Sequence, residues 1–219
     1  MKSHKARIIT WLLAVISFLL PAALYPVLPD RIPTHWDLNG TITYSAKYMI
    51  FLTAGMGLLF AVLFDVLPKI DPRRQNYQKF GGYYDLFCVL MQVFVLVLNG
   101  ISITEALRPG TLSVPTAVMI GIGLLFLFIG NMMPKFKSNF YMGIKTPWTI
   151  SNEEVWRKTH RLGGKCFFFS GLICILCGFL PLKNSLLYGF CTFIILTAAF
   201  FPAVMSYIWW RKLSNENPS

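Results

Sequence analysis

Six long runs of apolar residues dominate this 219-residue sequence and limit what it can fold into. Each run is nearly free of charge in its middle third and close to the roughly 20 residues that a helix needs to cross a bilayer. A single span must satisfy its backbone hydrogen bonds internally, and no run shows the alternation of a barrel strand, so helices are predicted. The predicted spans are residues 8–28, 48–67, 83–104, 114–133, 166–182 and 186–210.

Composition supports the same fold class. Hydrophobic residues make up 55% of the chain and charged residues only 13%. Globular domains carry about 25% charged residues, and a water-soluble domain of this size could not bury so much apolar surface. The predicted fold class is therefore an all-α membrane protein with six transmembrane helices.

Positive charges are unevenly divided between the two sides that six spans create. Sixteen of the 20 Lys and Arg residues precede span one, follow span six, or lie between spans two and three or four and five. The positive-inside rule places this side, with both termini and the loop 134–165, in the cytoplasm. The formal net charge of +11 is then mainly a topology signal that also attracts anionic membrane lipid. It does not require direct binding to nucleic acid.

Span one can also be read as a cleavable signal peptide, because Lys2, Lys5 and Arg7 precede its apolar run. However, the apolar run reaches Leu28, and residues 21–24 (PAAL) lack a clean small-x-small cleavage site. We therefore expect span one to be retained.

The extracytoplasmic loop 29–47 contains a hairpin signal. Asn39-Gly40 is the pair that best adopts a two-residue hairpin turn, and good strand formers flank it at 34–38 and 41–44. Trp36 and Tyr44 either anchor this hairpin at the lipid interface or contact a ligand.

The cytoplasmic loop ends in a predicted short amphipathic helix before span five. Ser151 and Glu154 have the spacing of a capping box, so the helix is expected to begin at about Asn152. Val155 and Trp156 lie on its apolar face, which is expected to lie on the inner membrane surface, with Trp148 as a second interfacial anchor. A bend at residues 163–164, both Gly, is expected before span five.

Two ion pairs are predicted on the polar face of this helix. Glu153 lies four residues before Arg157, and Glu154 lies four residues before Lys158, which is the favourable orientation along a helix.

No recognisable catalytic or metal-binding motif accompanies these elements, so we predict no cofactor and no enzyme activity. His160 is expected to be a hydrogen-bonded residue rather than a catalyst. Asp65 and Asp85 lie near span ends, where pairing with Lys69, Arg73 or the basic loop explains them more simply than an ion path. Gln92 and Asn99 are expected to form hydrogen bonds between helices.

Two longer segments resemble a known bacterial family. Residues 131–150 (NMMPKFKSNFYMGIKTPWTI) and 154–163 (EVWRKTHRLG) resemble the signature of the SdpI family. Residues 28–40 (LPDRIPTHWDLNG) resemble the uncharacterised membrane domain that precedes it in the same proteins. Lys145 stands where the family commonly has Arg. The expected division is an N-terminal two-span region, 1–82, and an SdpI-like four-span region, 83–219.

The resemblance implies an immunity and signalling protein of the bacterial cell membrane. Its expected partners are a secreted peptide toxin, a cytoplasmic winged-helix autorepressor and membrane lipid. The alternative function is a membrane enzyme or ion-coupled carrier that uses Asp65, Asp85, Glu154 or His160.

The candidate binding residues follow from these expected partners. Toxin contact is expected on the outer hairpin, and docking of the cytoplasmic partner on the segment 145–161. The alternative for the basic segment is that its charges only set topology and bind anionic lipid. The toxin-contact candidates are His35, Trp36 and Tyr44, and the docking candidates are Lys145, Trp148, Glu154, Trp156, Arg157, Lys158, His160 and Arg161.

Overall fold

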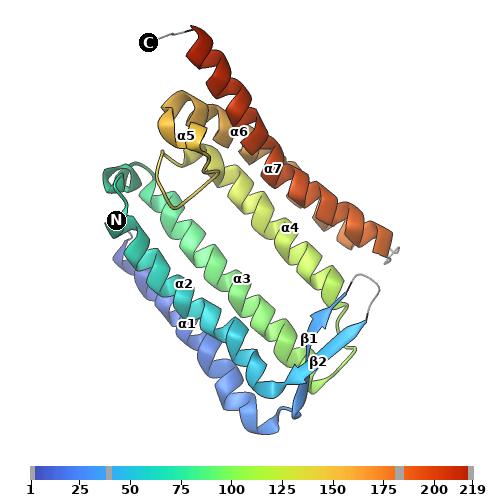
Figure 1. The fold of residues 1–219 in the computed structure, drawn as a ribbon. Helices are drawn as coiled ribbons and strands as arrows, with labels where there is room; N and C mark the ends of the chain where they lie inside the picture. Colours follow the sequence, from blue (N-terminus) through green and yellow to red (C-terminus); the bar gives the residue numbers. More distant parts are fainter. Residues whose placement is uncertain (1–2, 38–40, 181–184, 217–219) are drawn as a thin grey trace.

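The computed structural model describes residues 3–37, 41–180 and 185–216, and it is mostly helical (Figure 1). Within these residues, six helices are long and apolar enough to cross a membrane, which confirms the six predicted spans. They are α1 (His4–Leu24), α2 (Ile50–Ile70), α3 (Gly81–Leu107), α4 (Val114–Met132), α6 (Glu153–Gly178) and α7 (Ser185–Glu216).

Shorter elements lie at the two ends of this bundle. One end, called the hairpin end, carries strands β1 (Arg31–Trp36) and β2 (Ile42–Ala46) with the short helices η1 (Tyr25–Val27) and η2 (Lys47–Met49). The opposite end, called the loop end, carries η3 (Arg74–Phe80), η4 (Met133–Lys135) and α5 (Pro147–Ser151). Successive long helices run in opposite directions, so α1 begins and α7 ends at the loop end (Figure 1). That the loop end faces the cytoplasm stays a prediction.

The predicted hairpin is confirmed, because β1 and β2 form an antiparallel two-stranded sheet, which the predicted all-α fold class did not include. The register pairs Arg31 with Ala46 and Trp36 with Ile42, with an irregularity between Pro33 and His35. The strands were expected at 34–38 and 41–44, so β1 begins earlier than predicted. The predicted turn residues Asn39 and Gly40 lie outside the described residues.

A hydrophobic cluster fixes the hairpin to the first three helices. Ile32 of β1 is 1% exposed and packs with Leu28, with Ile50 of α2 and with Ile103 and Ala106 of α3. Because Ile32 is buried at the root of the hairpin, the sheet is held at a fixed position on the ends of α1–α3.

The first helix group, α1, α2 and α3, packs through small and polar residues. The buried face of α1 consists of Ala6, Thr10, Ala14, Ser17 and Pro21. From α3, Gln92 donates through Nε2 to the Gly57 carbonyl of α2 at 2.9 Å, and Asn99 donates through Nδ2 to the Ser17 hydroxyl of α1. The predicted interhelical role of Gln92 and Asn99 is therefore confirmed. Small residues and polar bonds of this kind hold helices together in lipid.

The second helix group, α4, α6 and α7, packs through glycines at the crossing of α4 with α6. A Cβ atom at Gly130 would lie only 2.4 Å from the Phe168 backbone nitrogen, and one at Gly171 only 2.4 Å from the Gly123 carbonyl oxygen. The two backbones thus touch directly, which side chains would prevent. By packing, α3 joins α1 and α2, so the predicted sequence division at residues 82 and 83 falls inside the first helix group.

Helix α6 runs without interruption from Glu153 to Gly178, so residues 163–164 do not separate a short helix from span five as expected. The predicted short amphipathic helix is instead the first part of this 26-residue helix. Gly163 and Gly164 are buried, and a Cβ at Gly164 would lie 2.7 Å from the Gly130 carbonyl oxygen. These glycines permit close packing rather than a change of direction.

The expected capping box at Ser151 is also wrong. Ser151 is the last residue of α5, and its hydroxyl donates to the Trp148 carbonyl at 3.2 Å. Asn152 has extended backbone angles and caps α6, because its Oδ1 accepts from the Glu154 and Val155 amides at 2.8 and 3.1 Å. Asn152 therefore separates α5 from α6, whereas the sequence suggested a single helix that begins near this residue.

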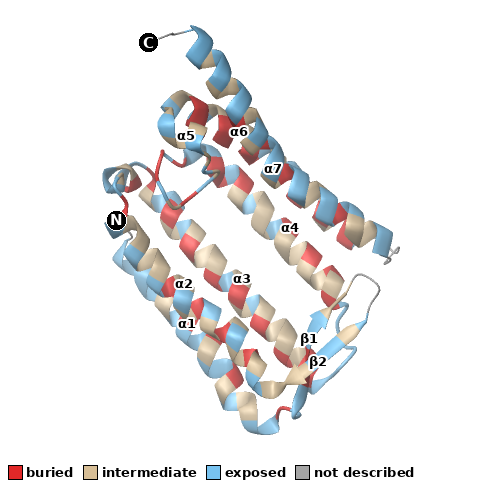
Figure 2. Ribbon diagram, in the orientation of Figure 1, coloured by how far each residue is buried: buried red, intermediate tan, exposed pale blue. Residues whose placement is uncertain are grey.

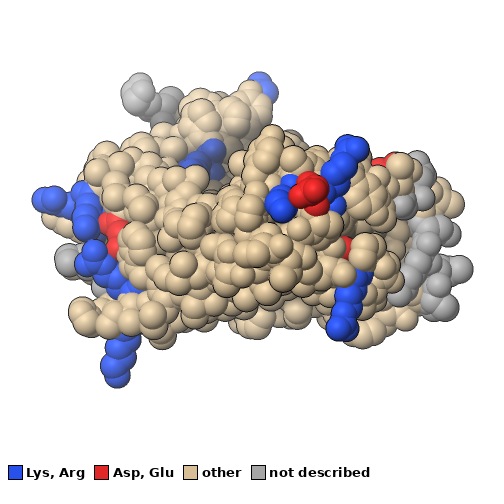
Figure 3. Space-filling view, turned by 90° about the horizontal axis from the view of Figure 1, so that it is seen from below, with Lys and Arg blue, Asp and Glu red and all other residues tan. Residues whose placement is uncertain are grey.

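The outer surface is mainly apolar. Exposed and half-buried residues continue along the whole length of α1, α2 and α7 (Figure 2). Phe193 and Phe200 of α7, for example, are 67% and 66% exposed. Seen from below, Lys, Arg, Asp and Glu lie in small groups separated by wide uncharged areas (Figure 3). Such a surface suits helices that are surrounded by lipid.

Candidate functional site

The connection between α4 and α6, residues 133–152, is folded across the loop end. Trp156, in the first turn of α6, is 3% exposed and donates through Nε1 to the Phe136 carbonyl at 2.9 Å. Val155 and Thr159 are buried as well. The apolar face of this helix therefore packs on the protein itself. Because Trp156 fixes the loop from inside, its predicted role as a membrane anchor is wrong.

His160 lies beneath the same loop and is 1% exposed. The Ile144 amide donates to its Nε2 at 3.1 Å, so Nδ1 carries the proton and donates to the Trp156 carbonyl at 2.8 Å. The Trp156 ring stacks on the imidazole with centroids 3.9 Å apart. Nε2 thus holds the loop, whereas Nδ1 is bonded within α6, so both ring nitrogens are occupied and His160 supports the surface without facing a partner.

Gly143 is the loop residue that allows this contact. Its φ of +100° favours glycine, and a Cβ there would lie 2.2 Å from His160 Nε2. A side chain at position 143 would displace the imidazole and the loop together.

A buried carboxylate joins this loop to the first helix group. Asp71, after α2, is 2% exposed. It accepts from the Arg73 amide at 2.7 Å, the Tyr77 hydroxyl at 3.1 Å and the Phe140 amide at 2.9 Å. Asp71 was not predicted as a site residue, because only the carboxylates near span ends, Asp65 and Asp85, and those of the cytoplasmic helix, Glu153 and Glu154, were weighed. The available signal was an Asp before Pro72, since Asp often bonds to the amide two residues later in a turn.

Two more residues complete the connection. Arg73 donates to the Ser138 hydroxyl and, at 2.8 Å, to the Ile150 carbonyl. Asn139 is fully buried, and its Oδ1 lies 3.3 Å from the Tyr77 hydroxyl. Asp71, Arg73, Tyr77, Ser138 and Asn139 are called the latch from here on. The latch binds the loop of the second helix group to the α2–α3 connection of the first.

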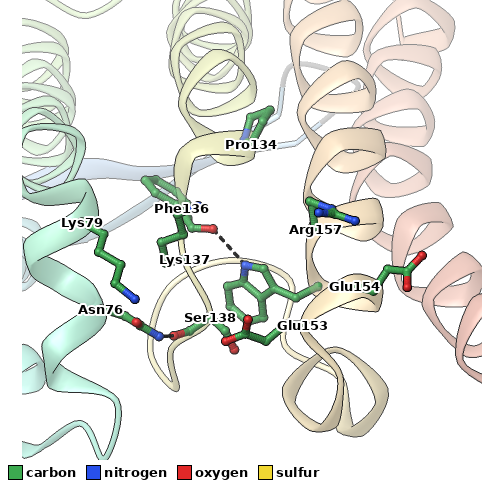
Figure 4. A pocket seen from close by; sticks show the side chains of 10 residues that line it. Asn76, Lys79, Pro134, Phe136, Lys137, Ser138, Glu153, Glu154 and Arg157 are labelled. Carbon is green, nitrogen blue, oxygen red and sulfur yellow. Dashed lines mark hydrogen bonds between the residues drawn. The ribbon is translucent and has the colours of Figure 1, made fainter.

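A polar pocket of about 310 Å³, called the loop pocket, opens next to the latch. In Figure 4, Asn76 and Lys79 come from η3, and Glu153, Glu154 and Arg157 come from α6 on the other side of residues 136–138. Cations and carboxylates thus line one hollow, which is complementary to a polypeptide surface of mixed charge rather than to a uniform polyanion. The lining residues are Asn76, Lys79, Pro134, Phe136, Lys137, Ser138, Glu153, Glu154, Trp156 and Arg157.

The predicted ion pairs on α6 form only in part. Lys158 Nζ lies 2.8 Å from Glu154 Oε1, which confirms one pair. Glu153 and Arg157 form no ion pair in the part of the chain that the structure describes, so the second prediction is wrong. Arg157 instead lines the loop pocket as an exposed cation.

The remaining docking candidates lie apart from the pocket. Lys145 is exposed and donates to the Tyr141 carbonyl at 3.2 Å. Trp148 is half-buried, with its ring 4.9 Å from that of Tyr207 in α7. Arg161 is exposed beside the crossing of α4 with α6. The segment 145–161 therefore presents several separate surfaces.

The toxin-contact candidates lie together at the hairpin end. His35 and Tyr44 are exposed, the latter to 40%, and Trp36 is half-buried opposite Ile42. The hairpin and the loop pocket are thus at opposite ends of the bundle (Figure 1).

Asp65 and Asp85 have other partners than predicted. Asp65 Oδ2 lies 2.8 Å from Arg7 Nε and accepts from Trp11 Nε1 at 3.0 Å. Asp85 accepts from the Ser3 amide at 3.1 and 3.2 Å. Both carboxylates tie the start of α1 to its neighbours, which favours a structural role. Among the described residues, no three His, Cys, Asp or Glu side chains are grouped so that they could hold a metal ion.

Comparison with known proteins identifies two regions. Residues 12–58 match a domain of unknown function, DUF1648, and residues 135–208 match the SdpI/YfhL protein family. The chain is 24% identical over 213 residues to "Immunity protein SdpI" of Bacillus subtilis (strain 168), which covers 97% of this chain and 99% of the relative. No solved structure matches the chain. This chain with six candidate membrane helices is therefore similar to the SdpI/YfhL family in its C-terminal part and to DUF1648 in its N-terminal part.

Proposed function

We propose that this chain is a membrane immunity protein that gives its bacterium tolerance to a secreted peptide toxin. The observation that carries the proposal is the similarity to an immunity protein over almost the full length of both chains. A similarity of that extent includes the six long helices, the hairpin and the loop together.

The hairpin end is the proposed toxin surface. His35 and Tyr44 are exposed on its surface, and Trp36 lies beside them on a sheet that Ile32 anchors. A sheet fixed in this way loses little conformational freedom when it binds, which favours affinity.

Tolerance of a sensitive host to the cognate membrane-active peptide tests this proposal. Expression of the chain should raise the peptide concentration that the host survives, and Trp36→Ala and Tyr44→Ala should lower it again. Tyr83→Ala is a matched control, because Tyr83 is also 40% exposed but lies at the loop end. If expression of the unaltered chain did not raise the tolerance of the host, the immunity role would be contradicted. Loss with Tyr83→Ala alone would contradict the hairpin surface.

We further propose that the loop pocket docks a cytoplasmic winged-helix autorepressor. The pocket combines the cations Lys79, Lys137 and Arg157 with Glu153 and Glu154, so a partner can be oriented by charges of both signs. Its walls are rigid because Trp156, His160 and the latch hold residues 136–150 in place.

Charge reversal separates docking from topology. Arg157→Glu would place a negative charge in the pocket, and Lys158→Glu would break the pair with Glu154. The double variant should stay inserted, keep toxin tolerance and lose co-sedimentation of epitope-tagged winged-helix regulators with membranes.

Arg211→Glu with Lys212→Glu makes the same charge change at the end of α7 and should retain co-sedimentation. Undiminished co-sedimentation with the correctly oriented Arg157/Lys158 variant would leave the loop as a structural element only.

A further inference from the structure

One face of α6 carries three positive charges at four-residue intervals. Arg157, Arg161 and Lys165 are exposed, and this spacing places them above one another on a helix. Like charges at this spacing repel each other. Arg161 and Lys165 form no ion pair or hydrogen bond with any other residue that the structure describes, so their mutual repulsion is not offset within this part of the chain.

The same face becomes apolar immediately after Lys165. Phe169, Leu172 and Leu176 follow on this face and are 58%, 36% and 59% exposed. Exposed apolar side chains on a membrane-spanning helix face hydrocarbon, and Lys or Arg at its end reach to the headgroups. The change from cations to apolar residues therefore places Arg161 and Lys165 at the level of the lipid phosphates, whichever side of the membrane the loop end faces.

A groove lies beside these two cations. It has a volume of about 250 Å³ and runs between α4, at Gly130 and Asn131, and α6. Arg161 and Lys165 line it at the loop end, and Phe168 and Phe169 line its apolar part. The groove thus has a cationic part, an amide group that can donate hydrogen bonds and an apolar floor in the order that a phospholipid requires.

We propose that this groove binds one acidic phospholipid. The phosphate lies between Arg161 and Lys165, the Asn131 amide donates to the headgroup, and an acyl chain packs on Phe168 and Phe169. Among the described residues that line the groove there is no carboxylate, so it offers no counter-charge to the ammonium group of a zwitterionic lipid. Basic pockets between membrane helices are suited to anionic headgroups. This inference depends on the membrane location and not on the proposed toxin or repressor.

Lipid counting by native mass spectrometry tests the proposal on the purified full-length protein in a neutral detergent. Phosphatidylglycerol should bind more tightly than phosphatidylcholine. Arg161→Gln with Lys165→Gln should weaken phosphatidylglycerol binding about thirtyfold, since each of the two basic groups near an anionic surface contributes about 1 kcal/mol. The matched control is Arg211→Gln with Lys212→Gln, which removes the same charge from α7. It should bind phosphatidylglycerol like the unaltered protein.

Four results would overturn the proposal. They are equal binding of the two lipids, equal weakening by the control double variant, displacement of phosphatidylglycerol by inorganic phosphate, and displacement by polyglutamate. The last would assign the cations to protein docking. Both substituted pairs are exposed, so the melting midpoint without added lipid should be unchanged and would show that each variant is folded.

Discussion

The two helix groups use different means to hold apolar helices together in a solvent as apolar as themselves. In α1–α3 the contact is made by small residues and completed by the side chains of Gln92 and Asn99, which donate to α2 and α1. In the second group, α4 and α6 meet backbone against backbone at glycines such as Gly130 and Gly164. The contact in the first group depends on side-chain hydrogen bonds, whereas the contact in the second group depends on glycines that have no side chain.

The difference predicts different tolerance to change. At Gly57 of α2, an added Cβ would have its nearest neighbour, Gln92 Oε1, at 3.4 Å, which is a tolerable contact. At Gly130 of α4, the nearest neighbour would be a backbone nitrogen at 2.4 Å, which cannot move without moving α6. Both glycines are buried, but the contact of α4 with α6 at Gly130 is less tolerant of an added side chain than the contact at Gly57.

The largest expected effect is that of Gly130→Ala. Overpacking a tight contact costs about 1–3 kcal/mol, and α4 and α6 must separate to admit the methyl group. The melting temperature in detergent should fall clearly. Gly57→Ala makes the same chemical change in the other group and should stay close to the unaltered protein. Equal melting temperatures for the two variants would contradict the distinction between the groups.

A smaller effect is expected when the connection between the groups is weakened. Asp71→Asn replaces one carboxylate oxygen with an NH2 group, which cannot accept the hydrogen bonds that the surrounding amides and the Tyr77 hydroxyl donate. The lost bonds should lower the stability of the folded loop by about 1–2 kcal/mol. Trypsin should then cleave within residues 133–152 about tenfold faster, because the loop opens more often. Asp30→Asn, at an Asp side chain that is 95% exposed at the hairpin end, serves as the control. Unchanged cleavage would show that the latch does not hold the loop.

The smallest effect is expected for Gln92→Met. This substitution keeps the length of the side chain and removes its bond to Gly57, and hydrogen bonds between membrane helices average about 0.6 kcal/mol. The melting temperature should fall only slightly. Leu90→Met on the same helix controls for the flexible side chain. A loss as large as that of Gly130→Ala would mean that polar bonds, and not close packing, dominate in both groups.

The spans and the hairpin could be predicted because their signals are local. A run of about 20 apolar residues has few alternatives to a membrane helix, and Asn39-Gly40 between strand formers marks a hairpin. The role of residues 163–164 could not be predicted in this way. A glycine pair is locally the same whether it ends a helix or packs against another segment. The distant neighbours decide between these roles, and they are Ile144 for Gly163 and Gly130 for Gly164.

The candidate site shows the same limit. The ion pair between Glu154 and Lys158 follows from helical spacing and was predicted correctly, whereas Glu153 and Arg157 have the same spacing and do not pair in the described part of the chain. The burial of Trp156 and His160 depends on where residues 136–144 fold, which no helical pattern contains. Asp71 escaped notice for the same reason, because two of its three donors come from η3 and the α4–α6 connection.

The uninterrupted course of α6 has a mechanical consequence. A helix of 26 residues is about 39 Å long, so a tilt of about 5° around one end moves the other end by about 3 Å. A bend at residues 163–164 would act as a joint and absorb that tilt before it reached Arg157. Because the hydrogen-bonded helix continues through these residues, a tilt of α6 at the hairpin end would carry to Arg157 at the loop pocket.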